Sequence, residues 1–370
     1  MTTSTLLDLT PAAARVALAD WLAVRDEAVF RLNQIMPRLW QRPVAAWADA
    51  TDLPRSLRDA LEQAFPLPRL ALQVEQTARD GTRKYLWELS DGQAIETVWI
   101  PEGRRRTLCV SSQVGCALGC VFCATGRMGL RRNLTPAEIA LQSRELVLRD
   151  PMLAPTNVVF MGMGEPLLNW PAVDAALTIL NSPIGMGIGA RHITVSTVGI
   201  PAGLAALAAR PEQFRLAVSL HAPTSERRRA LMPIEKRYPL PSIMRSLATF
   251  RRRVTFEYVL IAGANDTPAD ASALAALARD VGAMVNLLPL HPGGAPGLAG
   301  VSPARSESFA ARVRETGVET VVRRSRGLDI AAACGQLRVE VERRHKVRSE
   351  QHGDVEEEGG VPIDQHPTEP

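Results

Sequence analysis

The architecture of this chain is clearest in NVVFMGMGEPLLNWPAVDAALTIL, residues 157–180. A short apolar run is followed by a glycine-rich turn and then by a helical pattern that continues to residue 181. An apolar strand joined by a short turn to a helix of this length indicates a βα unit. Repeats of such a unit form a parallel sheet covered by helices.

The same unit recurs on both sides of this stretch. Predicted strands are TLCV (107–110), NVVFM (157–161), HITVS (192–196), FRLAVSL (214–220), VTFEYVLI (254–261), AMVNLLPL (283–290) and VETVVR (318–323). Predicted helices span 135–149, 171–181, 201–209, 224–231, 241–250, 268–279 and 303–316.

Two architectures satisfy this alternation, an open or closed (βα) barrel and a doubly wound sheet. Glycine-rich and polar turns follow the strand ends repeatedly, as in GMGEP, STVG, SLHAP and LHPGG. In barrels the active site is built from the loops at the carboxyl ends of the strands. We therefore predict an α/β fold with a partial (βα) barrel.

Four segments are expected along the chain. Residues 1–90 have a helical pattern and are predicted to form a small helical domain. Residues 91–106 form a hairpin linker, because an Asp-Gly pair interrupts the alternating pattern of KYLWELSDGQAIETVWIP. Residues 107–339 make up the barrel, and 340–370 a disordered tail, since so polar a run cannot offset its ordering entropy.

Composition is that of an ordinary globular protein. The 370 residues are 46% hydrophobic and 22% charged, which allows a sizeable core. No stretch approaches the roughly 18 apolar residues of a membrane span, and the amino terminus lacks a secretory signal pattern. We expect a cytoplasmic protein without membrane attachment.

The charge is unevenly distributed. Of 39 acidic residues, seven follow Arg348, so the rest of the chain carries 43 basic against 32 acidic residues. Arginine clusters recur at the ends of elements, for example at 104–106 and 323–326. Such an excess suits a polyanionic partner such as RNA; a solvated basic surface is the alternative.

Four of the five cysteines fall within fifteen positions, as Cys109, Cys116, Cys120 and Cys123, and Cys334 lies far downstream. A disulfide framework would spread them through a shorter chain. Three thiolates spaced Cys-x₃-Cys-x₂-Cys can ligate three irons of a cubane cluster and leave the fourth iron open. Zinc is the alternative, but a structural zinc usually takes four protein ligands.

With these cysteines the sequence resembles the RNA adenine methyltransferases of the RlmN/Cfr family, within the radical S-adenosylmethionine (SAM) superfamily. FRLNQIMPRLW (30–40) resembles the family's helical RNA-binding extension, less specifically. The other matching segments are CVSSQVGCALGCVFCATGRMGLRRNLTPAEI (109–139), GMGEPLLN (162–169), HITVSTVGI (192–200), LAVSLHAP (216–223), RRALMPIEKRYPL (228–240), RVTFEYVLIAGANDT (253–267) and RRSRGLDIAAACGQL (323–337).

The resemblance implies a radical SAM barrel and two cofactors. A [4Fe–4S] cluster is expected on Cys116, Cys120 and Cys123, and SAM is expected to be used twice per turnover. Two family asparagines are replaced, by His291 and by Glu235 in MPIEK. Residues expected at the SAM site are Gly164, Glu165, Ser196, Ser219, Leu220, His221 and His291.

The resemblance also assigns three reactive side chains. Cys334 is expected to carry a methyl group before it reaches RNA, and Cys109 to release the product by forming a disulfide with Cys334. Glu96 is expected to accept a proton. Read singly, Cys109 would be a small buried hydrophobe, Cys334 an ordinary helix residue and Glu96 an exposed strand residue.

The implied substrate is C2 of an adenine in 23S rRNA, and also in tRNA. The target base must leave its stack to enter a barrel mouth. Methylation at C8, as in Cfr, is the near alternative, and a non-catalytic Fe–S or zinc RNA-binding protein is the distant one. A flavodoxin or ferredoxin is the expected electron donor, and the chain is expected to be a monomer.

Overall fold

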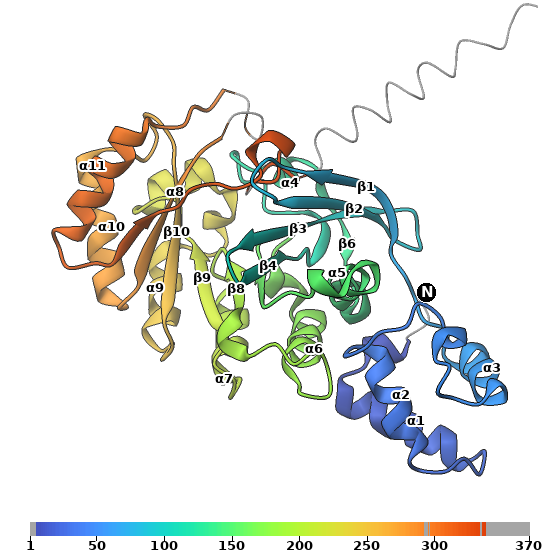
Figure 1. The fold of residues 1–370 in the computed structure, drawn as a ribbon. Coiled ribbons are helices and arrows are strands. Elements are labelled where there is room, and N and C mark those ends of the chain that lie inside the picture. Colours follow the sequence, from blue (N-terminus) through green and yellow to red (C-terminus); the bar gives the residue numbers. More distant parts are fainter. Residues whose placement is uncertain (1–4, 292–294, 296, 334, 338–370) are drawn as a thin grey trace, which may run out of the picture. The chain divides into compact units, whose positions relative to one another are not determined.

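A ten-stranded sheet is the frame of the computed structural model (Figure 1). The structure describes residues 5–291, 295, 297–333 and 335–337. Residues 1–337 belong to one compact unit. The tail predicted for 340–370 lies outside the described residues.

The predicted βα repeat is confirmed, with bounds that differ by only a few residues. All neighbours from β4 to β12 in the sheet pair in parallel. The strands are β4 (Arg105–Cys109), β7 (Asn157–Phe160), β8 (Ile193–Thr197), β9 (Arg215–Ser219), β10 (Val254–Leu260), β11 (Met284–Pro289) and β12 (Thr320–Val322).

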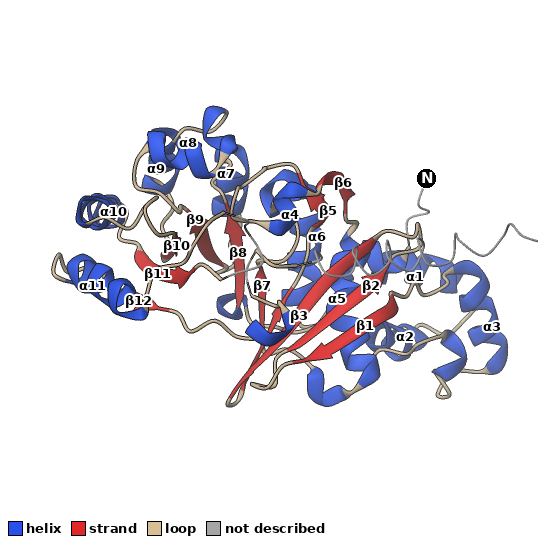
Figure 2. Ribbon diagram, turned by 90° about the horizontal axis from the view of Figure 1, so that it is seen from above, coloured by secondary structure: helices blue, strands red, loops and turns tan. Residues whose placement is uncertain are grey.

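Helices connect these strands and cover their outer face (Figure 2). Two of them begin with a Thr-Pro pair in a capping box, in which Thr135 and Thr267 accept from backbone N–H groups and Glu138 and Asp270 bond back. The helices are α5 (Pro136–Arg149), α6 (Trp170–Asn181), α7 (Pro201–Ala209), α8 (Ser225–Leu231), α9 (Leu240–Ala248), α10 (Pro268–Asp280) and α11 (Pro303–Arg314).

The strand order decides between the two predicted architectures. The parallel strands follow one another as β4-β7-β8-β9-β10-β11-β12, without the reversal that defines a doubly wound sheet. Among the described residues β1 and β12 are the two edges, so the sheet does not close. The arrangement is a partial barrel, as predicted.

The segment before the barrel differs from the prediction. Helices α1 (Pro11–Ala23), α2 (Arg31–Leu39) and α3 (Arg55–Ala64) are followed by strand β1 (Ala71–Thr77). The helical part therefore ends at Ala64, and not near residue 90. In β1, exposed and half-buried residues alternate, so the strand has no apolar face that the sequence would reveal.

Strands β1, β2 (Arg83–Glu88) and β3 (Ala94–Glu102) extend the sheet in antiparallel order from β4. The Asp-Gly pair lies in the turn between β2 and β3, where the alternating pattern places it. A separate two-stranded sheet is formed by β5 (Gln113–Cys116) and β6 (Gly129–Asn133), with α4 (Ala124–Arg127) between them.

Helix α5 attaches the amino-terminal helices to the barrel. The Arg144 side chain is buried and donates to the carbonyl oxygens of Leu39 (2.9 Å) and Val44 (2.5 Å). The adjacent Glu145 accepts two hydrogen bonds from Arg69 at 2.7 and 2.8 Å. These contacts fix the helical segment against α5.

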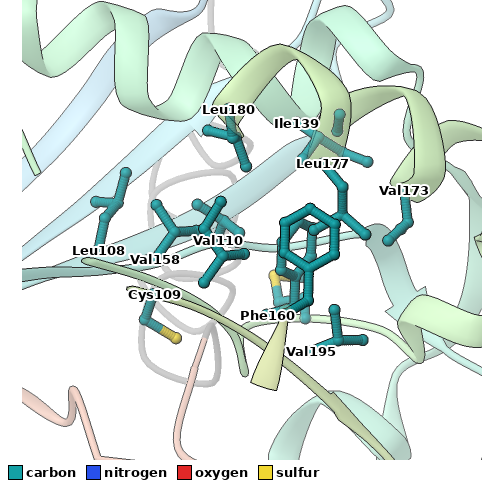
Figure 3. Close-up of a cluster of buried hydrophobic side chains, with 14 of the residues drawn as sticks. Leu108, Cys109, Val110, Ile139, Val158, Phe160, Val173, Leu177, Leu180 and Val195 are labelled. Carbon is teal, nitrogen blue, oxygen red and sulfur yellow. The ribbon is translucent and has the colours of Figure 1, made fainter. Parts of the chain in front are cut away.

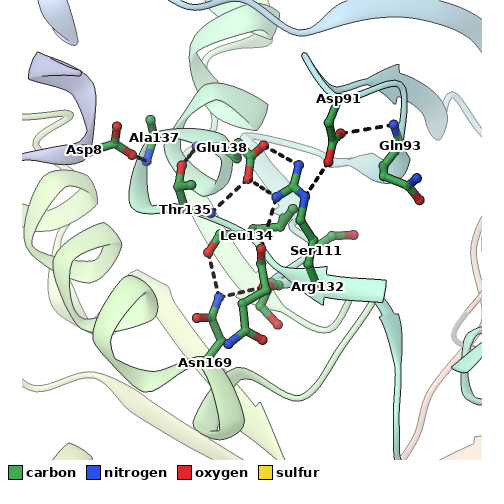
Figure 4. Close-up of polar contacts among 12 residues, drawn as sticks. Asp8, Asp91, Gln93, Ser111, Arg132, Leu134, Thr135, Ala137, Glu138 and Asn169 are labelled. Carbon is green, nitrogen blue, oxygen red and sulfur yellow. Dashed lines mark hydrogen bonds and ion pairs between the residues drawn. The ribbon is translucent and has the colours of Figure 1, made fainter. Parts of the chain in front are cut away.

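A second polar network surrounds Arg132 on β6 (Figure 4). Its guanidinium bonds Asp91, in the β2–β3 turn, at 2.6 Å and Glu138 of α5 at 2.7 and 2.8 Å. Asp8 accepts from the N–H of Ala137 at the start of α5. The network holds three segments that are distant in sequence.

The core lies between the parallel strands and their helices. Leu108, Val158 and Val195 of the strands pack against Leu177 and Leu180 of α6 (Figure 3). None of the described helices combines the length and apolar character that crossing a bilayer requires. Short 3₁₀ turns are η1 (Leu6–Asp8), η2 (Trp47–Asp49), η3 (Pro151–Leu153), η4 (Pro166–Asn169), η5 (Ala190–His192), η6 (Pro233–Lys236) and η7 (Leu328–Ile330).

Candidate active site

The three clustered cysteines lie on a loop that faces the carboxyl ends of the parallel strands. Cys116 ends β5, Cys120 lies in the turn, and Cys123 precedes α4. The turn requires glycine at Gly115, where φ is +75° and a Cβ would lie 1.9 Å from the carbonyl oxygen of Gly129. The glycine in the loop sequence therefore allows the backbone conformation that places the three thiols.

Two backbone contacts anchor this loop. The N–H of Val121 donates to the carbonyl of Leu231 at the end of α8 (3.0 Å), and that of Ala124 donates to the carbonyl of Gly335 (2.7 Å). The loop is thus tied both to the barrel and to the residue that follows Cys334 in the chain.

All three thiols line one cavity of about 150 Å³, called here the thiol cavity. Burial raises the pKa of Cys116 to about 12 and also raises that of Cys120, and proximity to Cys123 adds to both shifts. Without a strongly bound cation these thiols remain protonated. A metal that binds three thiolates would supply the missing positive charge.

The donor set fits a cluster better than a single ion. Within the described residues, no three His, Cys, Asp or Glu side chains converge closely enough to hold one metal. Zinc would need such convergence, because each Zn–S bond is about 2.3 Å long. A cubane cluster takes one thiolate on each of three irons, so the thiols can stand further apart.

Glu165 connects two of the turns that form the cavity wall. Its carboxylate accepts from the N–H groups of Leu167 (3.0 Å) and Val198 (2.9 Å). Burial raises the Glu165 pKa to about 7, against these hydrogen bonds. The preceding Gly164 has φ +100°, and a Cβ there would lie 2.5 Å from Gln113 Cβ, so only glycine fits.

Polar side chains from three neighbouring strands complete the wall. Ser196 on β8 and Ser219 on β9 have their hydroxyls 3.5 Å apart. Glu257 on β10 accepts from Asn286 Nδ2 at 3.0 Å, and burial raises its pKa. The cavity therefore offers hydroxyls and carboxylates suited to the hydroxyl, amine and carboxylate groups of a nucleoside-containing cofactor.

His221 offers one ring N–H to the cavity. Its Nδ1 accepts from the N–H of Val259 at 3.1 Å, which leaves the ring proton on Nε2. The residue has φ +56°, and Asn265 stabilises this conformation by donating to the carbonyls of His221 (2.7 Å) and Val259 (2.6 Å). Phe122 packs against the ring edge-on.

His221 predicts a pH dependence of stability. Burial, with a smaller contribution from Arg228, lowers its pKa from 6.5 to about 3. As the pH falls below 6.5, the imidazole binds a proton in the unfolded state but not in the folded state. The unfolded state is therefore stabilised relative to the folded state. Between pH 6.5 and about 5, the free energy of unfolding of the wild-type protein should fall by about 1–2 kcal/mol more than that of His221→Gln. Urea unfolding at each pH measures this difference. Equal slopes in the two proteins would contradict a buried neutral histidine.

A buried ion pair lies near the loop that carries the three clustered cysteines. Arg228 bonds Glu235 at 2.5 Å and the carbonyl of Val198 at 2.6 Å, and Glu235 accepts from the N–H of Leu240 at 2.8 Å. Neither charged side chain is exposed. Glu235, the departure from the family asparagine, thus supplies the counter-charge for Arg228.

Glu235→Ala should destabilise the protein by about 3–5 kcal/mol, because it leaves the buried Arg228 charge uncompensated. Urea unfolding of the metal-free protein measures this. Glu307→Ala is the matched control, since it breaks the exposed Arg314–Glu307 pair, which is worth about 0–1 kcal/mol. Similar losses in both variants would show that burial of the first pair is unimportant.

A second cavity of about 160 Å³ adjoins the first, and Phe122, Met161, Val259 and Leu288 line both. Cys109 lines the second cavity. On β4, Leu108 packs into the core while Cys109 points to the other side (Figure 3). Cys109 is therefore buried, as its interpretation as a small buried hydrophobe predicts, and it also faces a cavity.

The second cavity is lined by four arginines and one acid, Glu102, which lies 3.7 Å from Arg326, and it is called here the arginine-rimmed cavity. The floor of this cavity is apolar. His291 also lines the cavity, and its ring contacts the Ser325 hydroxyl. Ala333, the neighbour of Cys334, also lines it. The arginines of the rim are Arg105, Arg323, Arg324 and Arg326.

Glu96 is buried on β3 and ion-paired with Lys84 of β2, at 3.5 Å. Because side chains alternate along a strand, Glu96 shares a face with Val98 and Ile100, which line the arginine-rimmed cavity. The interpretation of Glu96 as an exposed strand residue is wrong.

The structure thus divides most of the predicted site residues between two adjoining cavities, and of those it describes Glu96 and Leu220 line neither. Leu220 is in neither wall: its side chain is in the core, and its N–H donates to the carbonyl of Glu257. Cys109 and His291 line the arginine-rimmed cavity, and Cys334 lies outside the described residues. The thiol cavity contains Cys116, Cys120, Cys123, Gly164, Glu165, Ser196, Ser219 and His221.

Some buried polar residues near the two cavities are not predicted from the sequence as site residues: Lys84, Arg228, Glu257 and Asn265. Glu257 had a signal, because a lone acid interrupts the apolar strand VTFEYVL. The roles of the others depend on contacts that the sequence does not reveal, including those of Lys84 with Ala331, Arg228 with Val198 and Asn265 with His221.

The sequence of the chain matches one family model and is similar to several known proteins. Residues 110–276 match the family model described as Radical SAM superfamily. The chain is 55% identical over 351 residues to a probable dual-specificity RNA methyltransferase RlmN of Gemmatimonas aurantiaca, covering 95% of this chain and 98% of the relative. It is 45% identical over 334 residues to the dual-specificity RNA methyltransferase RlmN of Anaeromyxobacter dehalogenans, covering 87% and 90%.

A solved structure is also similar. The crystal structure of a radical SAM methyltransferase from Sphaerobacter thermophilus superposes with a TM-score of 0.84 at 43% identity, covering 91% of this chain and 99% of that one.

Proposed function

The chain belongs to the RlmN family of dual-specificity RNA methyltransferases in the radical SAM superfamily, and we propose that it methylates C2 of an adenine in 23S rRNA and in tRNA. The observation that carries the proposal is the pair of adjoining cavities, one lined by three clustered thiols and the other by Cys109. The first suits the cofactors, and the second suits a base.

Cys116, Cys120 and Cys123 would hold a [4Fe–4S] cluster, and the polar wall from Glu165 to Glu257 would hold SAM beside it. When bound, the cluster supplies the electron that cleaves SAM to a 5′-deoxyadenosyl radical. Phe122, shared by both cavities, would separate the cofactor from the base while keeping them close.

The arginine-rimmed cavity would receive the adenine. Its apolar floor suits a flat base turned out of its stack, and its arginines suit the phosphates on either side. The RNA would thus be held by its backbone at the rim, with only the target base inside.

Cys334 would carry the methyl group, since an adenine carbon cannot attack a sulfonium methyl directly. The Cys334 thiol would take the methyl group of one SAM, and the resulting S-methyl group would give up a hydrogen to the radical formed from a second SAM. The methylene would then bond to the base carbon, and the adduct would lose the C2 proton to Glu96 and one electron to the oxidised [4Fe–4S] cluster. Consumption of two SAM molecules per turnover follows.

Cys109 would release the product. Its thiolate attacks the sulfur of Cys334, a disulfide forms, and the freed carbon takes a proton to become the methyl group. The disulfide must then be reduced. We propose that a flavodoxin or ferredoxin is the electron donor of the enzyme. We also propose that the chain is a monomer and that it acts in the cytoplasm.

Nucleoside analysis of modified RNA tests the regiochemistry. The reconstituted enzyme is incubated with SAM, reductant and a 23S rRNA fragment or tRNA, and the digested RNA is analysed by mass spectrometry against synthetic standards. We expect 2-methyladenosine from both RNAs. Exclusive formation of 8-methyladenosine would contradict the C2 assignment and favour the Cfr type.

A further inference from the structure

The turn between β1 and β2 holds a segment from the other end of the barrel. Asp80 accepts from the N–H of Gly327 at 3.1 Å, and the N–H of Arg79 donates to the Asp329 carboxylate at 3.0 Å. Gly327 has φ +63°, and a Cβ there would lie 3.0 Å from Thr82 Cγ2. The segment from Gly327 onward is therefore closely fitted to this turn.

Lys84 adds a third contact from the same hairpin. Its ammonium lies 3.3 Å from the carbonyl oxygen of Ala331 and 3.5 Å from Glu96 Oε1. The side chains of Lys84 and Glu96 are 5% and 1% exposed. A single buried cation thus contacts both the carboxylate on β3 and the segment that leads to Cys334.

The pairing of β2 with β3 places this cation beside the arginine-rimmed cavity. Lys84 lies opposite Val98, and Glu96 opposite Leu86, so Lys84 and Glu96 are diagonal neighbours on one face of the sheet. Val98 lines the cavity. The Lys84–Glu96 pair is therefore next to the space proposed for the base.

The buried Lys84–Glu96 ion pair is poorly explained by a contribution to the stability of the fold. Removing two charges from water costs several kcal/mol per ion, and an apolar pair of similar volume is often as stable. Lysine and glutamate are almost never fully buried unless paired. The arrangement is better explained by what the two charges do for each other.

We propose that Lys84 is a positioning residue, which keeps the Glu96 carboxylate ionised and fixes the Ala331 carbonyl, so that the proton acceptor and the Cys334 segment hold a common position. The proposal rests on the proposed function, because Glu96 accepts a proton only in that reaction. Removing the cation would take away a positive charge 3.5 Å from the Glu96 carboxylate, which favours the protonated form and so weakens Glu96 as a proton acceptor.

The test compares Lys84→Met with Lys84→Arg in the reconstituted holoenzyme. Lys84→Met should lower kcat for methyladenine formation on the order of 10²-fold, with KM for RNA, iron content and 5′-deoxyadenosine formation near wild type. The protein–RNA adduct should accumulate, because proton removal follows bond formation. Lys84→Arg, which keeps the cation, should recover most of kcat.

Arg83→Met is the matched control. It removes a cation from the neighbouring position, whose side chain is 37% exposed and pairs with Glu75, and it should leave kcat unchanged. Methylation by Lys84→Met within about twofold of wild type, or an arginine variant as slow as the methionine variant, would overturn the proposal.

Hydrogen exchange gives a readout that does not depend on turnover. The backbone amides of residues 327–333 should exchange faster in Lys84→Met than in wild type or Lys84→Arg, since the Ala331 anchor is lost. Unchanged exchange would overturn the anchoring role. Wild-type enzyme that binds iron but forms no methyladenine would instead refute the proposed function, and the exchange result would still decide the role of Lys84.

Discussion

Cys334→Ala is expected to reduce RNA methylation to the level of a no-enzyme control while the iron content stays at the wild-type value. The reason is chemical: without the Cys334 thiol, the methyl group of SAM has no carrier in the proposed mechanism. SAM cleavage to 5′-deoxyadenosine should continue, because Cys116, Cys120 and Cys123 are untouched. Iron analysis, 5′-deoxyadenosine quantification and nucleoside mass spectrometry measure the three quantities on one sample.

Cys109→Ala is the matched control for this variant. It should also fail to release product, but only after the methylene has bonded to the base, so a covalent protein–RNA adduct should accumulate. Methylation by Cys334→Ala above background would rule out a methyl group carried on that thiol.

Cys120→Ala should lose both the cluster and all SAM cleavage. Two remaining thiols leave one of the three ligated irons without a protein ligand, and the buried site offers no replacement of the same kind. Iron should fall from about four per chain to well below one after anaerobic reconstitution. Methylation should fall to background with it.

Cys109→Ala again serves as the control, because its iron content should equal that of wild type. Cys120→Ala protein that binds iron and cleaves SAM as wild type does would show that this thiol is not a ligand.

The barrel could be predicted because strands such as β7, β8 and β10 are buried on both faces. NVVFM and HITVS are short apolar runs, and each is separated from the next strand by a helix that has a proline in its first turn. Strand β1 could not be predicted, because its residues alternate between exposed and half-buried. Its place in the sheet depends on pairing with β2, which is a tertiary effect.

The thiol site could be predicted from spacing, since its ligands are neighbours in sequence. Lys84 could not, because its partners lie at Glu96 and at Ala331, which is 247 residues away. Nothing in the local sequence distinguishes this lysine from the half-buried Arg83 beside it. Buried charges that join distant segments become visible only when strand pairing is known.

Arg228 and Glu235 show the same limit in another way. The glutamate could be identified as a departure from the family asparagine, but its meaning required the 2.5 Å contact with a buried arginine seven residues earlier. Conversely, Leu220 follows the family pattern, yet its side chain belongs to the core, so only its backbone can contribute to the site.

An isotope-transfer experiment tests most directly whether the methyl group passes through the protein. The anaerobically reconstituted enzyme is first incubated with SAM that carries a trideuterated methyl group, then freed of it and given RNA, reductant and unlabelled SAM. The mechanism predicts that first-turnover methyladenine carries two deuterium atoms and one hydrogen from solvent, with the third deuterium in 5′-deoxyadenosine. Product without deuterium would mean that the methyl group comes directly from the second SAM, and would contradict the proposed role of Cys334.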